Sequence, residues 1–172
     1  MIWLIMVLAV GAAIVLENAV PAWQACGQAR LPAVVCVVMY YALNHAPAVA
    51  LLAGLLAGVM VDAASGMPHG YSPLVFCVLS MLVGRYRDFV FIRRWLTHMF
   101  LGAFAGLALT LMTYGLLLWR LEYMRELAPG WVFLKALGTA GMGLLCMPLV
   151  FVGLEALETC LGCRGSLVVD DF

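Results

Sequence analysis

The chain has 172 residues, of which 66% are hydrophobic and 10% are charged, and its formal net charge is +0. Soluble domains contain about 45–50% apolar and about 25% charged residues, and a soluble fold of this length has too little interior to bury so much apolar surface. The composition therefore excludes an ordinary soluble domain. The sequence also has no basic cluster large enough to suggest a partner made of nucleic acid.

The apolar residues come in unbroken runs, such as VVCVVMYYAL and AVALLAGLLAGVMV. Membrane barrels alternate apolar and polar residues, whereas membrane helices carry continuous apolar segments. We therefore expect an all-α polytopic membrane protein, with residues 1–172 forming a single integral membrane domain. The expected architecture is a six-helix transmembrane bundle with short second and third helices.

The first helix is expected at about residues 2–20, as a retained span, because no basic segment or cleavage site marks it as a signal peptide. Two short helices follow at about 32–44 and 47–61, the latter beginning at Pro47, which suits a first helical turn. Each is about 20 Å long, too short to cross a bilayer alone. They would be re-entrant, shielded by protein or set in a thinned bilayer. A kinked single span is the alternative.

The last three helices are expected at about 72–84, 95–119 and 131–157, with Ser72 and Pro73 as a cap and first-turn proline. Residues 158–172 are polar enough to form a cytoplasmic tail. Short cytoplasmic loops are enriched in arginine and lysine, so the basic loop should be cytoplasmic, and both termini with it. A five-span model would move the N-terminus outside. The basic residues of this loop are Arg85, Arg87, Arg93 and Arg94.

Small residues recur every four positions on two of these helices. Gly54 and Gly58 lead to Asp62 on the third helix, and Gly102 and Gly106 share one face of the fifth. Helices in lipid associate through close packing, which small residues permit. These faces either let helices of one bundle touch or receive a helix from another protein, and the sequence does not separate the two.

The ionisable residues of the spans give little sign of catalysis. They lie near span ends, whereas a proton relay would need carboxylates near mid-membrane. Asp62 and His69 could form an acid–base pair, but no nucleophile motif accompanies them, and Asp62 more simply accepts N–H groups of the turn. The CxxC of Cys160 and Cys163 is weak support for a metal. We expect no catalytic residues, no metal and no cofactor.

The stretch LLAGLLAGVMVDAASGMPHGYSPLVFCVLSMLVGRYR resembles the signature of the MreD family of bacterial rod shape-determining proteins. That signature combines a glycine-spaced apolar helix, an aspartate, a small-residue turn, a second apolar helix and a Gly-Arg exit. The acidic ending VVDDF has no counterpart in it. The matching residues are Gly54, Gly58, Asp62, Ser65, Gly66, Pro68, Gly70, Gly84 and Arg85.

The resemblance implies a non-enzymatic component of the inner membrane. Proteins of this family associate with the bitopic protein MreC, and through it with MreB filaments, the polymerase RodA and its penicillin-binding transpeptidase. They take part in the elongasome, which controls lateral peptidoglycan synthesis and rod shape. Their fold is considered similar to the substrate-binding subunits of energy-coupling-factor transporters. The glycine faces would then hold the transmembrane helix of MreC, and the arginine loop would meet cytoplasmic components or lipid headgroups.

Two other classes compete with this interpretation. A solute-binding subunit of a vitamin-type transporter would need polar groups inside the bundle. The fifth helix offers such groups in His98, Thr110, Thr113 and Tyr114. An enzyme acting on lipid inside the membrane is disfavoured, because the sequence has no recognisable nucleophile or metal-ligand motif.

Overall fold

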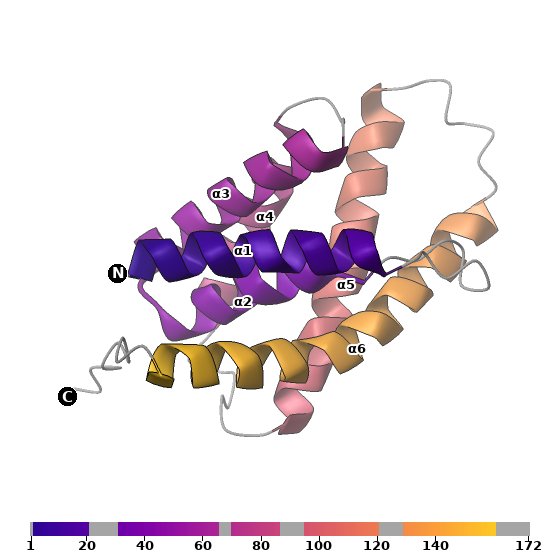
Figure 1. Cartoon of the computed structure of the whole chain (residues 1–172). Coiled ribbons are helices and arrows are strands. Elements are labelled where there is room, and N and C mark those ends of the chain that lie inside the picture. Colours follow the sequence, from indigo (N-terminus) through magenta and orange to yellow (C-terminus); the bar gives the residue numbers. More distant parts are fainter. Residues whose placement is uncertain (1, 21–30, 66–69, 87–94, 121–128, 161–172) are drawn as a thin grey trace.

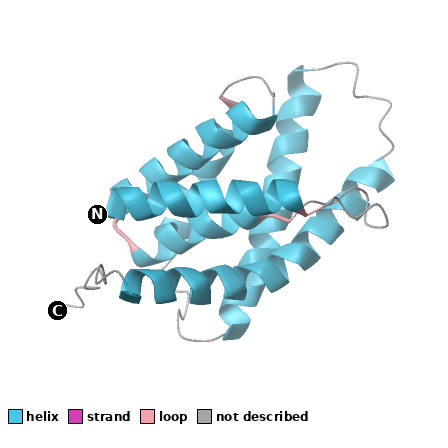
Figure 2. Cartoon of the chain, in the orientation of Figure 1, coloured by secondary structure: helices cyan, strands magenta, loops and turns pink. Residues whose placement is uncertain are grey.

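The computed structural model describes residues 2–20, 31–65, 70–86, 95–120 and 129–160 (Figure 1). These residues form helices and connecting turns, with no strand among them (Figure 2). The predicted all-α bundle is therefore confirmed. The helices are α1 (Ile2–Ala19), α2 (Ala33–Asn44), α3 (Pro47–Ser65), α4 (Tyr71–Tyr86), α5 (Trp95–Arg120) and α6 (Pro129–Cys160).

The segment around residue 45 contains two helices rather than a kinked span. His45 has an extended backbone, with φ −125° and ψ 171°, and this ends α2. Pro47 is the first residue of α3. The largest extensions past the ends expected from the sequence are in α3, which reaches Ser65, and in α6, which continues to Cys160.

The short helix α2 lies at the centre of the bundle. Every residue from Ala33 to Leu43 is buried, and α2 contacts all the other described helices. A helix that is apolar on all sides is stable when protein surrounds it on all sides. At 12 residues α2 is about 18 Å long, less than the roughly 30 Å of a hydrocarbon core. Because the neighbouring helices bury α2, its polar ends can lie within the protein, and the helix does not have to match the thickness of the bilayer.

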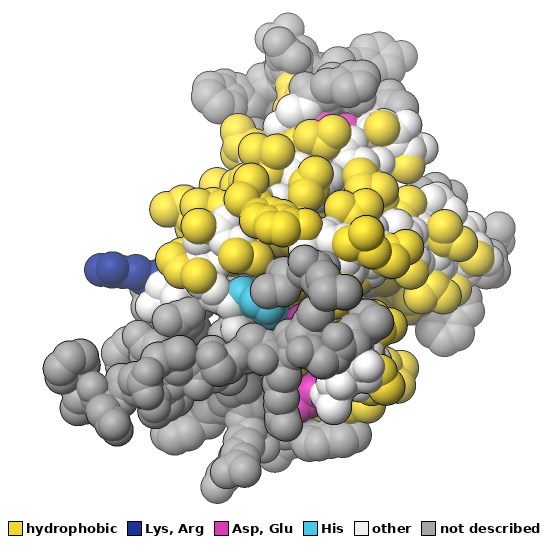
Figure 3. Space-filling model, turned by 60° about the vertical axis from the view of Figure 1, so that its left-hand side comes forward, with side chains coloured by type: hydrophobic (Ala, Val, Ile, Leu, Met, Phe, Trp, Pro, Cys, Tyr) yellow, Lys and Arg dark blue, Asp and Glu magenta, His cyan; other side chains and the backbone are white. Residues whose placement is uncertain are grey.

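Three described helices contain a segment long and apolar enough to cross a membrane: Pro47–Ala64, Thr97–Gly115 and Val132–Cys160. The shorter apolar segments are Trp3–Ala19, Ala33–Asn44 and Tyr71–Arg85. Large apolar side chains, including Leu8 and Leu145, are exposed on the outside of the bundle. Figure 3 shows apolar side chains over most of the described surface on one side. Such a surface is stable against lipid tails rather than water.

The ends of α1, α2 and α6 lie toward two opposite ends of the bundle. The start of α1, the α2–α3 connection and the end of α6 lie at the same end (Figure 1). The last turn of α1 and the first turns of α2 and α6 lie toward the other end. The first and last described helices therefore have their outer ends, near Ile2 and Cys160, at the same end of the bundle.

Candidate functional site

The helical hairpin of α3 and α4 is held together by Asp62. This carboxylate is 1% exposed. Its Oδ2 accepts the backbone N–H of Gly70 at 2.7 Å, and its Oδ1 accepts that of Ser72 at 3.3 Å. Ser72 lies in the first turn of α4, where N–H groups lack partners within the helix and a negative charge is favourable. Asp62 of α3 therefore caps α4 across the hairpin.

Glycine lets the two helices of this hairpin touch. A Cβ added to Gly58 would lie 2.7 Å from the carbonyl carbon of Ser72 and still closer to Pro73. At Gly54 it would lie 3.1 Å from the carbonyl oxygen of Phe76. A side chain at position 58 would therefore force α3 away from the start of α4 and pull Asp62 from its partners.

The other residues of the expected outer turn are only partly described. Ser65 is the last residue of α3, and Gly70 has φ +109°, a conformation that favours glycine. Gly66, Pro68 and His69 lie outside the described residues. Of the expected basic loop, Arg85 lies in the last turn of α4. The other members, Arg87, Arg93 and Arg94, lie outside the described residues.

A second pair of glycines brings α5 and α6 together. A Cβ on Gly102 would collide with the carbonyl oxygen of Gly143, and a Cβ on Gly106 would lie 2.7 Å from that of Thr139. The contact is reciprocal, because a Cβ on Gly143 would collide with the carbonyl of Gly102. Both glycine faces predicted from the sequence thus contact helices of the same chain. A partner helix could reach either face only if α4 or α6 moved away.

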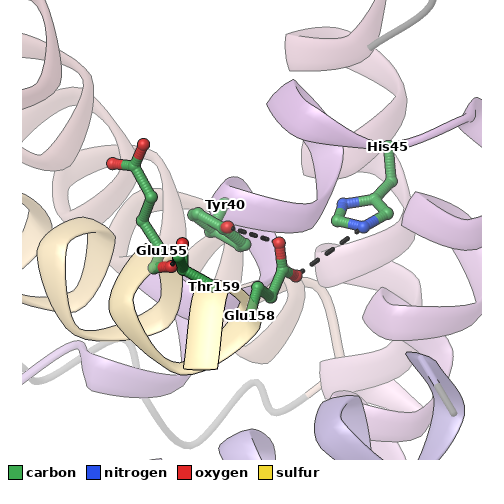
Figure 4. A network of polar contacts seen from close by, with 5 residues as sticks. All are labelled: Tyr40, His45, Glu155, Glu158 and Thr159. Carbon is green, nitrogen blue, oxygen red and sulfur yellow. Dashed lines mark hydrogen bonds and ion pairs between the residues drawn. The ribbon is translucent and has the colours of Figure 1, made fainter. Parts of the chain in front are cut away.

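A polar network closes the end of the bundle where α2 and α6 finish (Figure 4). Tyr40 Oη donates to Oε2 of Glu158 at 2.9 Å, and Nε2 of His45 lies 3.7 Å from Oε1 of the same carboxylate. Glu158 is 9% exposed and lies inside α6, although the sequence suggested that a water-exposed tail begins at this residue. The apolar run ends near Leu157, so the sequence did not indicate that α6 continues to Cys160.

Aromatic rings surround this network. The ring centroids of Tyr40 and Phe151 are 4.9 Å apart, and those of His98 and Phe151 are 4.2 Å apart. Tyr41 packs edge-on against Tyr40 at 5.6 Å. His98 therefore lies in this cluster, away from the other polar residues of α5. The sequence reasoning missed the cluster, since Tyr40 and Glu158 are 118 residues apart.

A cavity of about 150 Å³ lies at the opposite end of the bundle. Thr110, Thr113 and Tyr114, which the sequence offered as inward polar groups, all line it. Lys135 joins them, with its Nζ 3.3 Å from the Tyr114 hydroxyl oxygen. The full lining is Glu17, Pro32, Leu109, Thr110, Thr113, Tyr114, Lys135 and Thr139.

Comparison with known families decides what kind of protein carries these features. The model of the family described as rod shape-determining protein MreD matches residues 1–128. The chain belongs to the MreD family. No curated protein and no solved structure matches the chain.

The MreD match contains the whole α3–α4 hairpin, including Asp62 and the glycines packed beside it. It ends before α6, which begins at Pro129. The Tyr40–Glu158 pair and the cavity beside Lys135 therefore join residues inside the MreD match to residues beyond it.

Proposed function

We propose that the chain is a non-enzymatic membrane scaffold of the cell-elongation machinery. It binds the transmembrane helix of MreC and helps couple MreB filaments to peptidoglycan synthesis by RodA and its penicillin-binding transpeptidase. Membership of the MreD family, which determines rod shape, is the observation that carries this proposal. Its place is the bacterial inner membrane, with both termini and the Arg85–Arg94 region on the cytoplasmic side.

The geometry of the signature hairpin supports a structural role for its one carboxylate. Both oxygens of Asp62 accept backbone N–H groups, and the side chain is buried. A carboxylate fixed in this way stabilises the junction of two helices. The hairpin thus supplies a rigid element of the kind that a scaffold needs.

We propose that MreC binds at a glycine that the bundle leaves open. The faces of Gly54, Gly58, Gly102 and Gly106 already hold α3 to α4 and α5 to α6. At other glycines of the described helices an added Cβ would meet nothing within 4 Å, and a glycine of this kind permits another helix to approach closely. We expect the MreC helix at one of them: Gly11, Gly115, Gly141 or Gly153.

Co-purification of MreC with single Gly→Leu variants tests this assignment. One or more of the four open-glycine variants should reduce recovered MreC by about tenfold, which corresponds to about 1.4 kcal/mol, and leave the melting temperature unchanged. Gly130→Leu is the control, because that glycine is open but lies at the start of α6. Gly58→Leu should instead lower the melting temperature.

Cell shape provides the second readout of the same variants. A variant that loses MreC should fail to restore rods to cells that lack their own MreD protein. Normal MreC recovery and normal rods with all four open-glycine variants would rule out this binding position. Loss of rods with MreC still bound would place the defect elsewhere in the assembly.

The transporter alternative finds less support in the geometry. Pockets for drug-sized ligands enclose about 300–1,000 Å³. The cavity beside Thr110 and Tyr114 has about 150 Å³, and His98 lies outside its lining. A vitamin-sized solute would need a larger space than this cavity offers.

A further inference from the structure

One outer face of α6 has the residue spacing of a surface that packs against another helix. Side chains that lie alternately four and three residues apart share one face of a helix, and left-handed helix pairs use this spacing. On α6 it connects six residues, of which Pro148 is half-buried and the others are exposed. These residues form the α6 face: Gly141, Leu145, Pro148, Val152, Glu155 and Thr159.

The apolar part of the α6 face permits close approach. Leu145 and Val152 are 63% and 53% exposed. One turn before Leu145, a Cβ added to Gly141 would meet nothing within 4 Å. Exposed apolar side chains beside an open glycine let a second helix pack closely in lipid.

Glu155 places a charge toward the end of this face. It is exposed and lies within the apolar segment Val132–Cys160. Its backbone carbonyl accepts the Thr159 hydroxyl at 2.6 Å, but among the described residues its carboxylate has no hydrogen bond or ion pair. The carboxylate points away from Tyr40 and Glu158 (Figure 4). A carboxylate beside lipid is costly unless a cation accompanies it, so this end of the face favours a basic partner.

The charge of Glu155 decides among the possible occupants of the face. A second copy of the chain, packed on this face about a twofold axis along the membrane normal, would bring two Glu155 carboxylates together. Anionic lipid headgroups would be repelled in the same way. A transmembrane helix of another protein carries Lys and Arg mainly at its cytoplasmic end, which is the side expected for the end of α6. Such a helix matches the face in apolar surface and in charge.

The position of Glu155 also separates the two open glycines of α6. Gly141 and Glu155 are two heptads apart, so they share a face. Gly153 is two residues from Glu155, and the turn of about 100° per residue places it on another side of the helix. Resting on the proposed function, we propose that the α6 face binds the transmembrane helix of MreC, and that Glu155 pairs with a Lys or Arg at the cytoplasmic end of that helix.

Co-purification of MreC with the full chain in detergent tests the position. Gly141→Leu should lower the recovered MreC by about tenfold, because the new side chain fills the space of the incoming helix. Gly153→Leu is the matched control. This glycine is equally open and lies on the same helix but outside the α6 face, so recovery should not change.

A charge exchange tests the pairing. Glu155→Lys should lower MreC recovery by about tenfold, whereas Leu157→Lys, which adds a positive charge on another exposed side of α6, should not. Glutamate in place of the basic residues at the cytoplasmic end of the MreC helix should lower recovery with the wild type and restore it with Glu155→Lys. Melting temperatures of the variants should match that of the wild type, because the replaced residues are exposed.

Wild-type recovery of MreC with both Gly141→Leu and Glu155→Lys would overturn the α6 assignment and leave the scaffold proposal standing. Failure of the wild type to bind MreC would overturn both. Two differently tagged copies of the chain, expressed together, test self-association. Loss of the copy–copy contact in Gly141→Leu, with MreC recovery unchanged, would assign the face to a second copy and contradict the proposal.

Discussion

Asp62 shows how one side chain can organise the junction of two membrane helices. It is buried, and its two oxygens accept N–H groups from Gly70 and Ser72. The sequence favoured an aspartate that bonds to its own turn, and it placed the cap of the fourth helix on Ser72. In the structure Asp62 does accept the N–H of Gly70 in that turn, and it also caps the fourth helix by accepting the N–H of Ser72, ten residues along the chain.

Asp62→Ala should therefore destabilise the hairpin. It leaves the N–H groups of Gly70 and Ser72 without their acceptor, at about 1–3 kcal/mol for each group that water does not reach. Asp62→Asn should cost less, because one oxygen acceptor remains. Thermal unfolding in detergent measures both. Glu155→Ala is the control, since Glu155 is an exposed carboxylate of α6. An unchanged melting temperature for Asp62→Ala would contradict the capping role.

The Tyr40–Glu158 bond should tie α2 to the end of α6. A double-mutant cycle with Tyr40→Phe and Glu158→Met isolates it, because each substitution removes one partner of the direct 2.9 Å bond. Hydrogen bonds to charged groups contribute about 1.5–3 kcal/mol. We expect a coupling energy of about that size from unfolding experiments. Additive effects of the two substitutions would show that the bond contributes nothing to stability.

At the scale of elements, close backbone contact sets the positions of α5 and α6. Lipid tails give helices no hydrophobic reason to associate, so packing of this kind carries the interaction. The sequence predicted which residues permit close approach, because small residues every four positions form one face of a helix. It did not predict the partner of each face, since Gly102 could meet a glycine of this chain or of another protein.

Alanine at two glycines of this region should have different effects on the melting temperature. Gly106→Ala places a methyl group 2.7 Å from the Thr139 carbonyl oxygen, so it should lower the melting temperature. Gly141→Ala meets nothing within 4 Å and should leave it unchanged or raise it slightly, because alanine is the better helix former. Thermal unfolding of the two variants side by side is the measurement. Equal changes in melting temperature would contradict the close backbone contact between Gly106 of α5 and Thr139 of α6.

The central position of α2 predicts a difference among native cysteines. Cys36 is 0% exposed in α2, whereas Cys160 is exposed at the end of α6. A membrane-permeant maleimide should modify Cys160 quickly and Cys36 only after denaturation, as read by mass spectrometry of peptides. Rapid modification of Cys36 in the folded protein would place α2 at the surface.

At the scale of the whole molecule, the sequence predicted the helical bundle but not its internal arrangement. Apolar runs and prolines mark the helices, because these features act locally. The sequence left three placements open for the short helix α2: re-entrant, shielded by protein or set in a thinned bilayer. Its uniform apolarity did not decide among them, because such a helix suits lipid as well as a protein interior. The cavity and the Tyr40–Glu158 pair depend on which helices become neighbours, and no local pattern records that.

The arrangement of helix ends also predicts the topology. The start of α1 and the end of α6 lie at one end of the bundle (Figure 1), so reporter fusions at the two termini should report the same side. We expect the cytoplasmic side for both, because of the arginines near residue 85. A fusion within residues 121–128 should report the periplasm. Opposite sides for the two termini would contradict an even number of spans.

Photo-crosslinking to MreC in living cells tests the central claim most directly. A crosslinking amino acid at outward positions beside open glycines, such as Leu8 and Leu145, should capture MreC from at least one helix face. The same amino acid at Ala53 or Ala57, buried on the helix that packs against α4, should capture none. Capture of MreC from the buried positions alone would show that the helices separate to admit MreC. That result would contradict a preformed scaffold that binds MreC on its outer surface.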